Sequence, residues 1–457
     1  MSTAVNSVSQ PVEKLDFKKI LPVFVIILID LLGLTIIIPV LALYAASFGA
    51  NAATIGLLGA VYPAAQVIGA PFLGRLSDRF GRKPVLIISQ IGTLLGFLLL
   101  GFADALWIFF LARLIDGLSG ANISTAQAVI TDSTTEKTRT QGLGLVGAAF
   151  GIGFVIGPVI SYLALSLSRN NYHAPAFVAA GFSLISILLT IFLLKETLPQ
   201  ERRAILNTRR EISLSMLFDT LKKPFVGFLL MVMFFQQLAF GMFQQMLSLF
   251  TLNRLGLNAS GNSVIFVFVG IVVVAVQGYF IGRWSRKFGE KWLIRFGLIM
   301  LLAGLLLTAL TPRIPVPWYS QASVAAELSG GRSVPGETPP TQSLAVDIPS
   351  DANKGLFGLA WILVAMIPAA IGGGVLQPSI NSLLTRNVSV VEIGGTLGIS
   401  AALLSAANAF APVIGGALFQ RIYPGAPYLF GSLVAVLLVL ISLRGLEKRA
   451  RQPEKRS

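Results

Sequence analysis

The stretch GRLSDRFGRKP, residues 74–84, decides how the rest of the chain is interpreted. It carries Arg75, Asp78, Arg79, Arg82 and Lys83, yet it separates two long apolar runs. A related stretch, GRWSRKFGEKW, occupies residues 282–292, and Gly, Arg, Ser, Phe, Gly and Lys recur there at an offset of 208 positions. Short basic clusters between apolar runs are typical of loops that join membrane helices.

Composition points to the same class of protein. Of the 457 residues, 54% are hydrophobic and 12% charged, whereas soluble domains carry roughly 25% charged residues. The net charge of +15 lies in clusters between apolar runs, so we expect no nucleic-acid partner. The absence of cysteine excludes disulfides and cysteine metal sites, and the one histidine, His173, lies in a polar stretch and is expected in a loop. No metal or other cofactor is expected.

Twelve apolar runs are long enough to cross a bilayer core, which needs about 20 helical residues. We therefore expect an all-α polytopic membrane protein of two pseudo-symmetric six-helix bundles, residues 20–194 and 225–443. The first six spans are expected at 20–43, 54–74, 84–103, 106–131, 141–166 and 174–194. The second six are expected at 225–250, 262–282, 293–311, 356–384, 395–418 and 425–443.

The remaining segments are polar. They are an N-terminal tail (1–19), a basic linker (195–224), a Pro-, Gly- and Ser-rich outer loop (312–355) that we expect to be flexible, and a C-terminal tail (444–457). With the N-terminus inside, the outer segments hold Arg169, Arg254, Arg313, Arg332, Lys354 and Arg421, and Arg113 lies within a span. All other residues among the 35 Lys and Arg then face the cytoplasm, so both termini are expected there.

A second pair of similar segments supports two halves. GPVIS at 157–161 resembles APVIG at 411–415, an offset of 254 positions. The long loop at 312–355, which has only a short counterpart in the first half, accounts for most of the difference from 208. Two similar six-helix halves are how many secondary transporters expose a central site to either side in turn.

These segments resemble the major facilitator superfamily. Its signature between spans 2 and 3, G-x-L-x-D-R-x-G-R-K, is matched by Gly74, Leu76, Asp78, Arg79, Gly81, Arg82 and Lys83. LARLIDGLSGAN resembles its second motif through Arg113, Gly117 and Gly120, and Gly144, Gly153, Gly157 and Pro158 resemble the glycine ladder of its proton-coupled antiporters. DLLGLTIIIPVL and LKETLP resemble its drug:proton antiporters of the tetracycline efflux type.

The chain departs from these patterns in two places. Ser161 and Tyr162 stand where the antiporter motif usually has Gly-Gly, which weakens the antiporter assignment. In the second copy of the charged stretch, Arg286 stands at the position of Asp78 and Glu290 at that of Arg82. We therefore expect the two inner loops to differ as switches.

The resemblance implies a conformational gate. Its members would be Gly74, Asp78, Arg79, Gly81, Arg82, Lys83, Gly153, Gly157 and Pro158. An acid at the C-terminal end of a helix is unfavourable beside that helix's own dipole, so Asp78 should contact another helix or an arginine. In the family this acid is implied to latch the inner side against the other half, and the alternative is a local loop contact. For the glycines and Pro158 the alternative is simple close packing and bending.

Ionisable residues inside spans are costly and are by default functional candidates. Asp30 is the candidate for proton coupling, with Arg113 and Asp116, which lie three apart on one helical face. The alternatives are a structural acid at Asp30 and a local Arg113–Asp116 pair. Substrate-binding candidates are the amides Asn122, Gln236, Gln237, Gln244, Gln277, Gln377, Asn381 and Asn408. Such amides equally join helices by hydrogen bonds.

The sequence thus predicts a secondary transporter of the bacterial inner membrane that exports small organic compounds in exchange for protons. We expect it to act as a monomer within the lipid bilayer. No nucleotide-binding loop is present to use ATP, and no catalytic cluster among the spans indicates an enzyme. The nearest alternative is a carrier of a sugar or another metabolite. A non-transporting receptor or a membrane enzyme is the alternative from another class.

Overall fold

The computed structural model describes residues 17–120, 122–134, 139–198, 220–329, 346–388 and 393–446. The regular elements among these residues are helices, and eleven of them are long and apolar enough to cross a membrane. The predicted all-α membrane architecture is confirmed. The ends of both tails, most of the linker and the middle of the loop at 312–355 lie outside the described residues.

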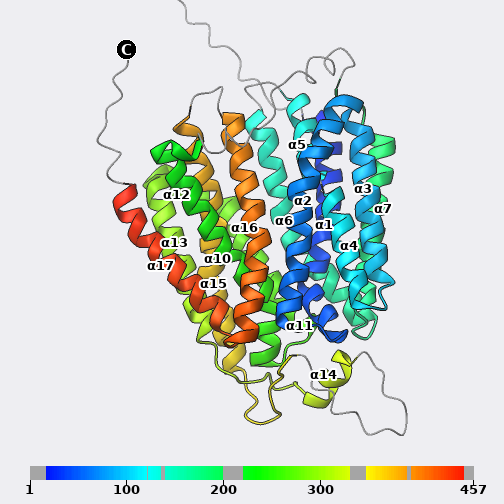
Figure 1. Cartoon of the computed structure of the whole chain (residues 1–457), viewed down its shortest axis with the longest axis vertical. Helices are drawn as coiled ribbons and strands as arrows, with labels where there is room; N and C mark the ends of the chain where they lie inside the picture. Colours follow the sequence, from blue (N-terminus) through cyan, green and yellow to red (C-terminus); the bar gives the residue numbers. More distant parts are fainter. Residues whose placement is uncertain are drawn as a thin grey trace, which may run out of the picture.

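The helices form two bundles. The first half contains α1 (Phe17–Ser47), α2 (Ala52–Phe80), α3 (Arg82–Gly101), α4 (Leu106–Ser119), α5 (Asn122–Asp132), α6 (Arg139–Leu167) and α7 (His173–Leu193). The second contains α10 (Pro224–Leu255), α11 (Ala259–Ala275), the π-helical turn η1 (Val276–Phe280), α12 (Ile281–Phe288), α13 (Glu290–Ala309), α14 (Gln321–Leu328), α15 (Phe357–Arg386), α16 (Ile393–Arg421) and α17 (Ala426–Gly445). The two bundles stand side by side, blue to cyan beside green to red (Figure 1).

The fourth predicted span is not one helix, which corrects the expectation for residues 106–131. It is divided between α4 and α5, and Gly120 lies at the break. The Ser89 hydroxyl donates to the Ser119 carbonyl, and the Gln66 side-chain amide donates to the Gly120 carbonyl at 2.8 Å. Broken helices are tolerated inside a membrane where neighbouring groups satisfy the freed backbone in this way. Together α4 and α5 supply the twelfth span.

The halves meet along two pairs of helices, α2 with α16 and α6 with α11. A Cβ atom at Gly56 would lie 2.2 Å from the carbonyl oxygen of Pro412, and one at Gly270 would lie 2.5 Å from that of Phe154. Small residues let membrane helices approach closely, because helix association there depends on packing rather than on expulsion of water. The interface between the halves therefore requires glycine at both contacts.

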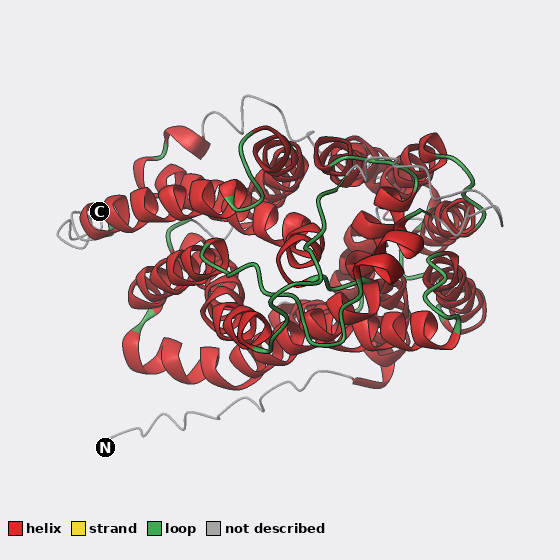
Figure 2. Ribbon diagram, turned by 90° about the horizontal axis from the view of Figure 1, so that it is seen from below, coloured by secondary structure: helices red, strands yellow, loops and turns green. Residues whose placement is uncertain are grey.

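The loop at 312–355 is partly ordered, which corrects the expectation of a flexible segment. Its described ends, together with α14, form a cap on the bundle (Figure 1). The Val316 amide donates to the Leu255 carbonyl at 3.0 Å, and the Tyr319 hydroxyl donates to the Pro349 carbonyl at 2.6 Å. We call this end of the bundle the α14 face, and the opposite end, which holds residues 74–84, the motif face. Figure 2 views the molecule from the α14 face, with the connecting loops in front.

His173 is also more ordered than expected. It begins α7, and its Nδ1 lies 2.8 Å from the Tyr44 hydroxyl and 2.9 Å from the Gly101 carbonyl oxygen. Both partners lie near the α14 face. The polar stretch around His173 predicted a loop, but the imidazole in fact joins α7 to α1 and α3.

Candidate functional site

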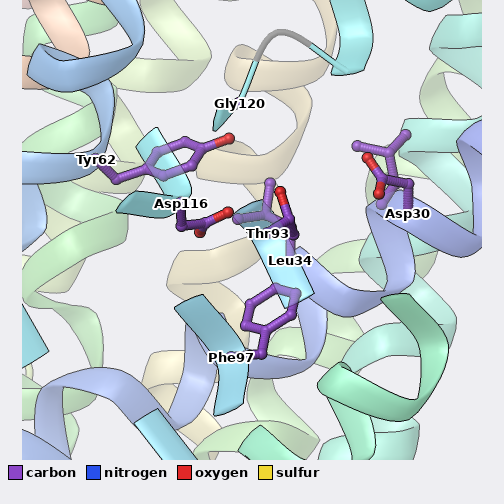
Figure 3. A pocket seen from close by; sticks show the side chains of 8 residues that line it. Asp30, Leu34, Tyr62, Thr93, Phe97, Asp116 and Gly120 are labelled. Atoms are coloured by element: carbon purple, nitrogen blue, oxygen red, sulfur yellow. The ribbon is translucent and has the colours of Figure 1, made fainter. Parts of the chain in front are cut away.

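A small cavity lies within the first half, lined from α1, α2, α3 and the α4 end. Its walls are Asp30, Leu31, Leu34, Tyr62, Thr93, Phe97, Asp116 and Gly120 (Figure 3). Its volume of about 20 Å³ is enough for one water molecule. Gly120 lies at the break between α4 and α5 and also lines the cavity, so the break is at the edge of the cavity.

Arg113 and Asp116 form an ion pair beside the cavity. Arg113 Nη1 lies 2.9 Å from Asp116 Oδ2, and both residues are buried, with exposed fractions of 7% and 3%. The guanidinium also lies over the ring of Tyr62, 4.4 Å from its centroid. A buried carboxylate and a buried guanidinium stabilise each other, because either charge buried alone carries a large desolvation penalty. The local pair is thus present, and its Asp116 also lines the cavity.

Asp30 faces the same cavity from α1. Figure 3 places it on the opposite side of the cavity from Asp116 and Tyr62, with Thr93 between them. A second, apolar hollow against Asp30 is lined by Ile26, Ile27, Leu31, Leu86, Gln90 and Ala126. The three ionisable residues that the sequence singled out therefore converge on one place in the first half.

Sequence reasoning missed two polar members of this cavity, Tyr62 and Thr93. Tyr62 stacks on Arg113, and Thr93 hydrogen-bonds to Asp116 from α3. Gly96 lets α3 approach, since a Cβ there would lie 2.9 Å from the Asp116 Cβ. The available signal was a polar side chain within an apolar span, but Thr and Tyr occur so often in membrane helices that the signal is weak.

At the motif face, Arg82 is the centre of a compact network. Its guanidinium lies 2.7 Å from Asp78, 3.0 Å from Asp132 at the end of α5, and 2.9 Å from the Ser77 hydroxyl. Gly81 has a φ of +108°, a left-handed value that favours glycine and separates α2 from α3. Asp132 was not among the sequence candidates, because its role depends on where α5 ends in space.

Glu196 fastens the start of α3 to the end of the first half. Its carboxylate accepts the backbone N–H groups of Arg82 and Lys83 at 2.9 and 3.2 Å. These are donors that a helix N-terminus leaves without a partner inside the helix, and a carboxylate there also complements the helix dipole. Lys83 Nζ donates in turn to the Ile191 carbonyl at 2.7 Å. The LKETLP segment after α7 is thus tied to the charged motif.

The described contacts of Asp78 lie within its own half. It pairs with Arg82, and its side chain is 36% exposed. A Cβ atom at Gly74 would meet no atom within 4 Å among the described residues, so there is open space beside this one position of α2 at the motif face. The local contact of Asp78 with Arg82 is present in this conformation. The latch of Asp78 onto the other half stays a prediction for a different conformation of the transporter.

The glycine ladder of α6 packs on α1. A Cβ atom at Gly157 would lie 2.1 Å from Thr35 Oγ1, and one at Gly153 would lie 3.7 Å from Leu31 and Thr35. Pro158 lies inside α6 immediately after this contact. Gly144 lies in α6 outside the residues whose surroundings are described. The packing alternative therefore has direct geometric support at Gly157.

Several candidate amides join helices of the second half. Gln237 Nε2 donates to Asn408 at 2.8 Å between α10 and α16, and Gln277 Nε2 donates to the Gly374 carbonyl at 3.3 Å. The Ser400 hydroxyl donates to Asn381 at 3.1 Å. Gln236 is buried, Gln244 is half-buried and Gln377 is exposed, while the side chain of Asn122 lies outside the described residues. The role of these amides in substrate binding stays a prediction, and the hydrogen bonds of Gln237, Gln277 and Asn381 join neighbouring helices.

Comparison with known proteins identifies relatives along most of the chain. Residues 23–360 match the family model described as Major Facilitator Superfamily. The class B tetracycline resistance protein of Escherichia coli is 28% identical over 425 residues, 92% of this chain and 94% of that protein. Multidrug resistance protein 2 of Bacillus subtilis (strain 168) is 28% identical over 439 residues, 93% and 96% of the two chains.

The fold is also found among solved structures. The nucleoside transporter NupG matches 94% of this chain and 99% of its own with a TM-score of 0.69 at 13% identity. A human organic anion transporter matches 94% of this chain and 100% of its own with a TM-score of 0.59 at 19% identity. At these identities the likeness establishes the fold alone.

Proposed function

Because the chain belongs to the Major Facilitator Superfamily, we propose that it exports tetracycline-like or other drug-like compounds across a bacterial inner membrane in exchange for protons. The chain is a multi-pass membrane transporter of this family, and its tetracycline and multidrug resistance relatives align over more than nine-tenths of its length. Those relatives favour drug efflux over the sugar or metabolite carrier that the sequence left open.

The observation that carries the proton part of the proposal is the cavity in the first half. Asp30 and Asp116 both line it, and the cation of Arg113 is bound to one of them at 2.9 Å. A carboxyl beside a pocket the size of one water can exchange a proton when the pocket is opened to either side. We assign proton loading to Asp30 and assign to Arg113 and Asp116 the sensing of that proton through the shared cavity.

The proposed cycle also accounts for the conformation of the molecule. Contacts between the halves occur near the α14 face: the Ala52 amide donates to Gln420 at 3.2 Å, the Ser260 hydroxyl to Asn170 at 2.5 Å, and the Ser248 hydroxyl to the Pro39 carbonyl at 3.2 Å. The open space beside Gly74 lies at the motif face. The distribution of Lys and Arg makes the motif face cytoplasmic. This conformation then corresponds to a carrier that is closed to the outside.

The experiment that tests the proposal uses purified protein in weakly buffered detergent with a pH-sensitive dye. Tetracyclines, cationic drugs and sugars are added in turn to the wild type and to Asp30→Asn. Proton release when a drug is added, lost in Asp30→Asn while drug binding persists, is the expected result. Binding of a sugar with no drug-dependent release would overturn the proposal in favour of a metabolite carrier.

A matched control comes from the same helix. Thr35 lies one turn beyond Asp30, is buried, and donates its hydroxyl to the Leu31 carbonyl at 2.9 Å. Thr35→Ser keeps that hydrogen bond and does not alter the cavity lining. Loss of proton release in both variants would indicate damage to α1 rather than loss of a proton site.

A further inference from the structure

The short helix α14 connects the two halves at the α14 face. It belongs to the second half by sequence, yet it packs against α1 of the first half. Val324 and Leu328 are buried on its inner side, with exposed fractions of 7% and 4%. An isolated helix of eight residues is not stable in water, so α14 depends on these contacts for its position.

One carboxylate fastens α14 to both halves. Tyr172, which precedes α7, donates its hydroxyl hydrogen to Glu327 Oε1 at 2.6 Å. The side-chain amide of Asn258, the N-cap of α11, donates to Glu327 Oε2 at 3.2 Å. Tyr172 is 6% exposed, so the bond lies in a largely dry place, where hydrogen bonds to a carboxylate are strong.

We propose that α14 is a strap that closes the α14 face across the two halves, and that Glu327 is the residue that fastens it. The fold of the transporter family requires one face to open while the other closes, and the two donors to Glu327 lie on opposite sides of that division. When the halves separate at this face, Glu327 cannot keep both Tyr172 and Asn258. The strap therefore has to be released in every cycle.

The strap also responds to protons on its own side of the membrane. Burial raises the pKa of Glu327, although the hydrogen bonds from Tyr172 and Asn258 lower it. In the released strap the carboxyl meets water, and its pKa returns toward the ordinary value. The closed strap thus holds a proton more tightly, so closure is favoured as pH falls through the closed-state pKa and loses that advantage as pH rises.

Other ionisable groups lie near the strap. Burial and the neighbouring Glu327 raise the pKa of Tyr172, which keeps the phenol a donor. The others at this face include Tyr44, Asp104, Arg169, His173, Arg254, Arg313, Tyr319, Asp347, Asp351, Lys354, Arg421 and Tyr423. Four of them form two ion pairs, Arg313–Asp347 and Lys354–Asp351. An acidic exterior would therefore favour closure, the step that returns a protonated antiporter to its inward-facing form.

The test uses the natural absence of cysteine. Ala52 is 1% exposed at the contact between α2 and α16, away from the strap, so an Ala52→Cys reporter reacts with a membrane-impermeant maleimide when the α14 face opens. Glu327→Ala should raise the labelling rate in intact cells by about tenfold, since two hydrogen bonds to a charged group are lost. Tyr172→Phe should raise it by about threefold. Glu327→Gln mimics the protonated carboxyl, so the reporter cysteine in this variant should be labelled slowly at both pH 5.5 and pH 7.5.

The control is Gln321→Ala, which truncates an exposed side chain of α14 itself, keeps the bond from the Gln321 backbone N–H to Asp351, and should leave labelling as in the wild type. Unchanged labelling in both Glu327→Ala and Tyr172→Phe would overturn the strap, because α14 would then be a fixed cover. The strap proposal depends on the proposed orientation in one respect, which is the side of the membrane to which the maleimide is added. Labelling in inverted vesicles but not in intact cells would overturn that orientation, and the same comparison of variants would then test the strap from the other side.

Discussion

Arg82 and Glu290 occupy equivalent positions in the two halves and carry opposite charges. Each begins a helix, α3 or α13, directly after a glycine with a left-handed φ, +108° at Gly81 and +78° at Gly289. Arg82 pairs with Asp132 at the end of α5, at 3.0 Å. Glu290 pairs with Arg386 at the end of α15, at 2.7 Å. Asp132 and Arg386 are 254 positions apart, the offset of the second repeat, so the same two helix ends are joined in each half with reversed polarity.

This symmetry predicts that the first pair can be exchanged. Arg82→Glu or Asp132→Arg alone should destabilise the protein by about 3 kcal/mol, because each leaves like charges in a largely buried place. The double variant Arg82→Glu/Asp132→Arg should recover part of that loss, because it restores an opposite pair like that of Glu290 and Arg386 while the new carboxylate still lies beside Asp78. Thermal unfolding in detergent measures the effect. A double variant no more stable than either single one would refute a direct pairing.

The repeat explains what the sequence could and could not predict at this place. Alignment of the two charged stretches identifies Arg286 and Glu290 as departures, and from them unequal inner loops are predicted. It does not reveal the compensating change at Arg386, which lies 96 positions further along, in another span. Periodic apolar runs fix where helices cross the membrane, but the partner of a charge depends on which helix ends meet in space.

The buried pair at Arg113 and Asp116 gives a second prediction, which separates structure from coupling. Arg113→Gln alone should destabilise the protein by about 3–5 kcal/mol, since it leaves the Asp116 carboxylate buried without its cation. Arg113→Gln/Asp116→Asn should restore most of the stability and still lack drug-dependent proton release. Thermal unfolding and the pH-dye assay read the two effects. Normal drug-dependent proton release by the double variant would mean that Arg113 and Asp116 have only a structural role.

The candidate site shows a similar division between composition and geometry. Asp30, Arg113 and Asp116 were identifiable because charges inside spans are rare; Asp30 and Asp116 line one cavity, and Arg113 pairs with Asp116. Tyr62 and Gly120 line that cavity for reasons the sequence does not display: the ring packs under Arg113, and span 4 breaks at Gly120. The substrate role of the amides stays a prediction, and bonds such as Gln237–Asn408 join neighbouring helices.

The charged motif leads to a third prediction, on the latch at the motif face. Asp78→Asn should reduce transport about tenfold or more while leaving insertion and thermal stability near those of the wild type. The reason is that Arg82 keeps Asp132 and Ser77 in this conformation, whereas the latched conformation needs the charge of Asp78 for the other half. Drug flux in membrane vesicles, normalised to the amount of inserted protein, measures the change. Wild-type flux would leave Asp78 with a local role.

The contact between α2 and α16 provides the last prediction. Gly56→Ala should disfavour closure of the α14 face, because the added methyl would lie 2.2 Å from the Pro412 carbonyl oxygen and backbone atoms cannot yield as a flexible side chain does. Disulfide formation between Asn170→Cys and Ser260→Cys, which replace residues in contact across the halves, should fall at least about fivefold in a Gly56→Ala background. Gly181→Ala is the control, since a Cβ there meets no atom within 4 Å among the described residues. Equal crosslinking in all three backgrounds would mean that the halves accommodate the methyl group without opening, and that close approach of α2 and α16 does not set the closed state.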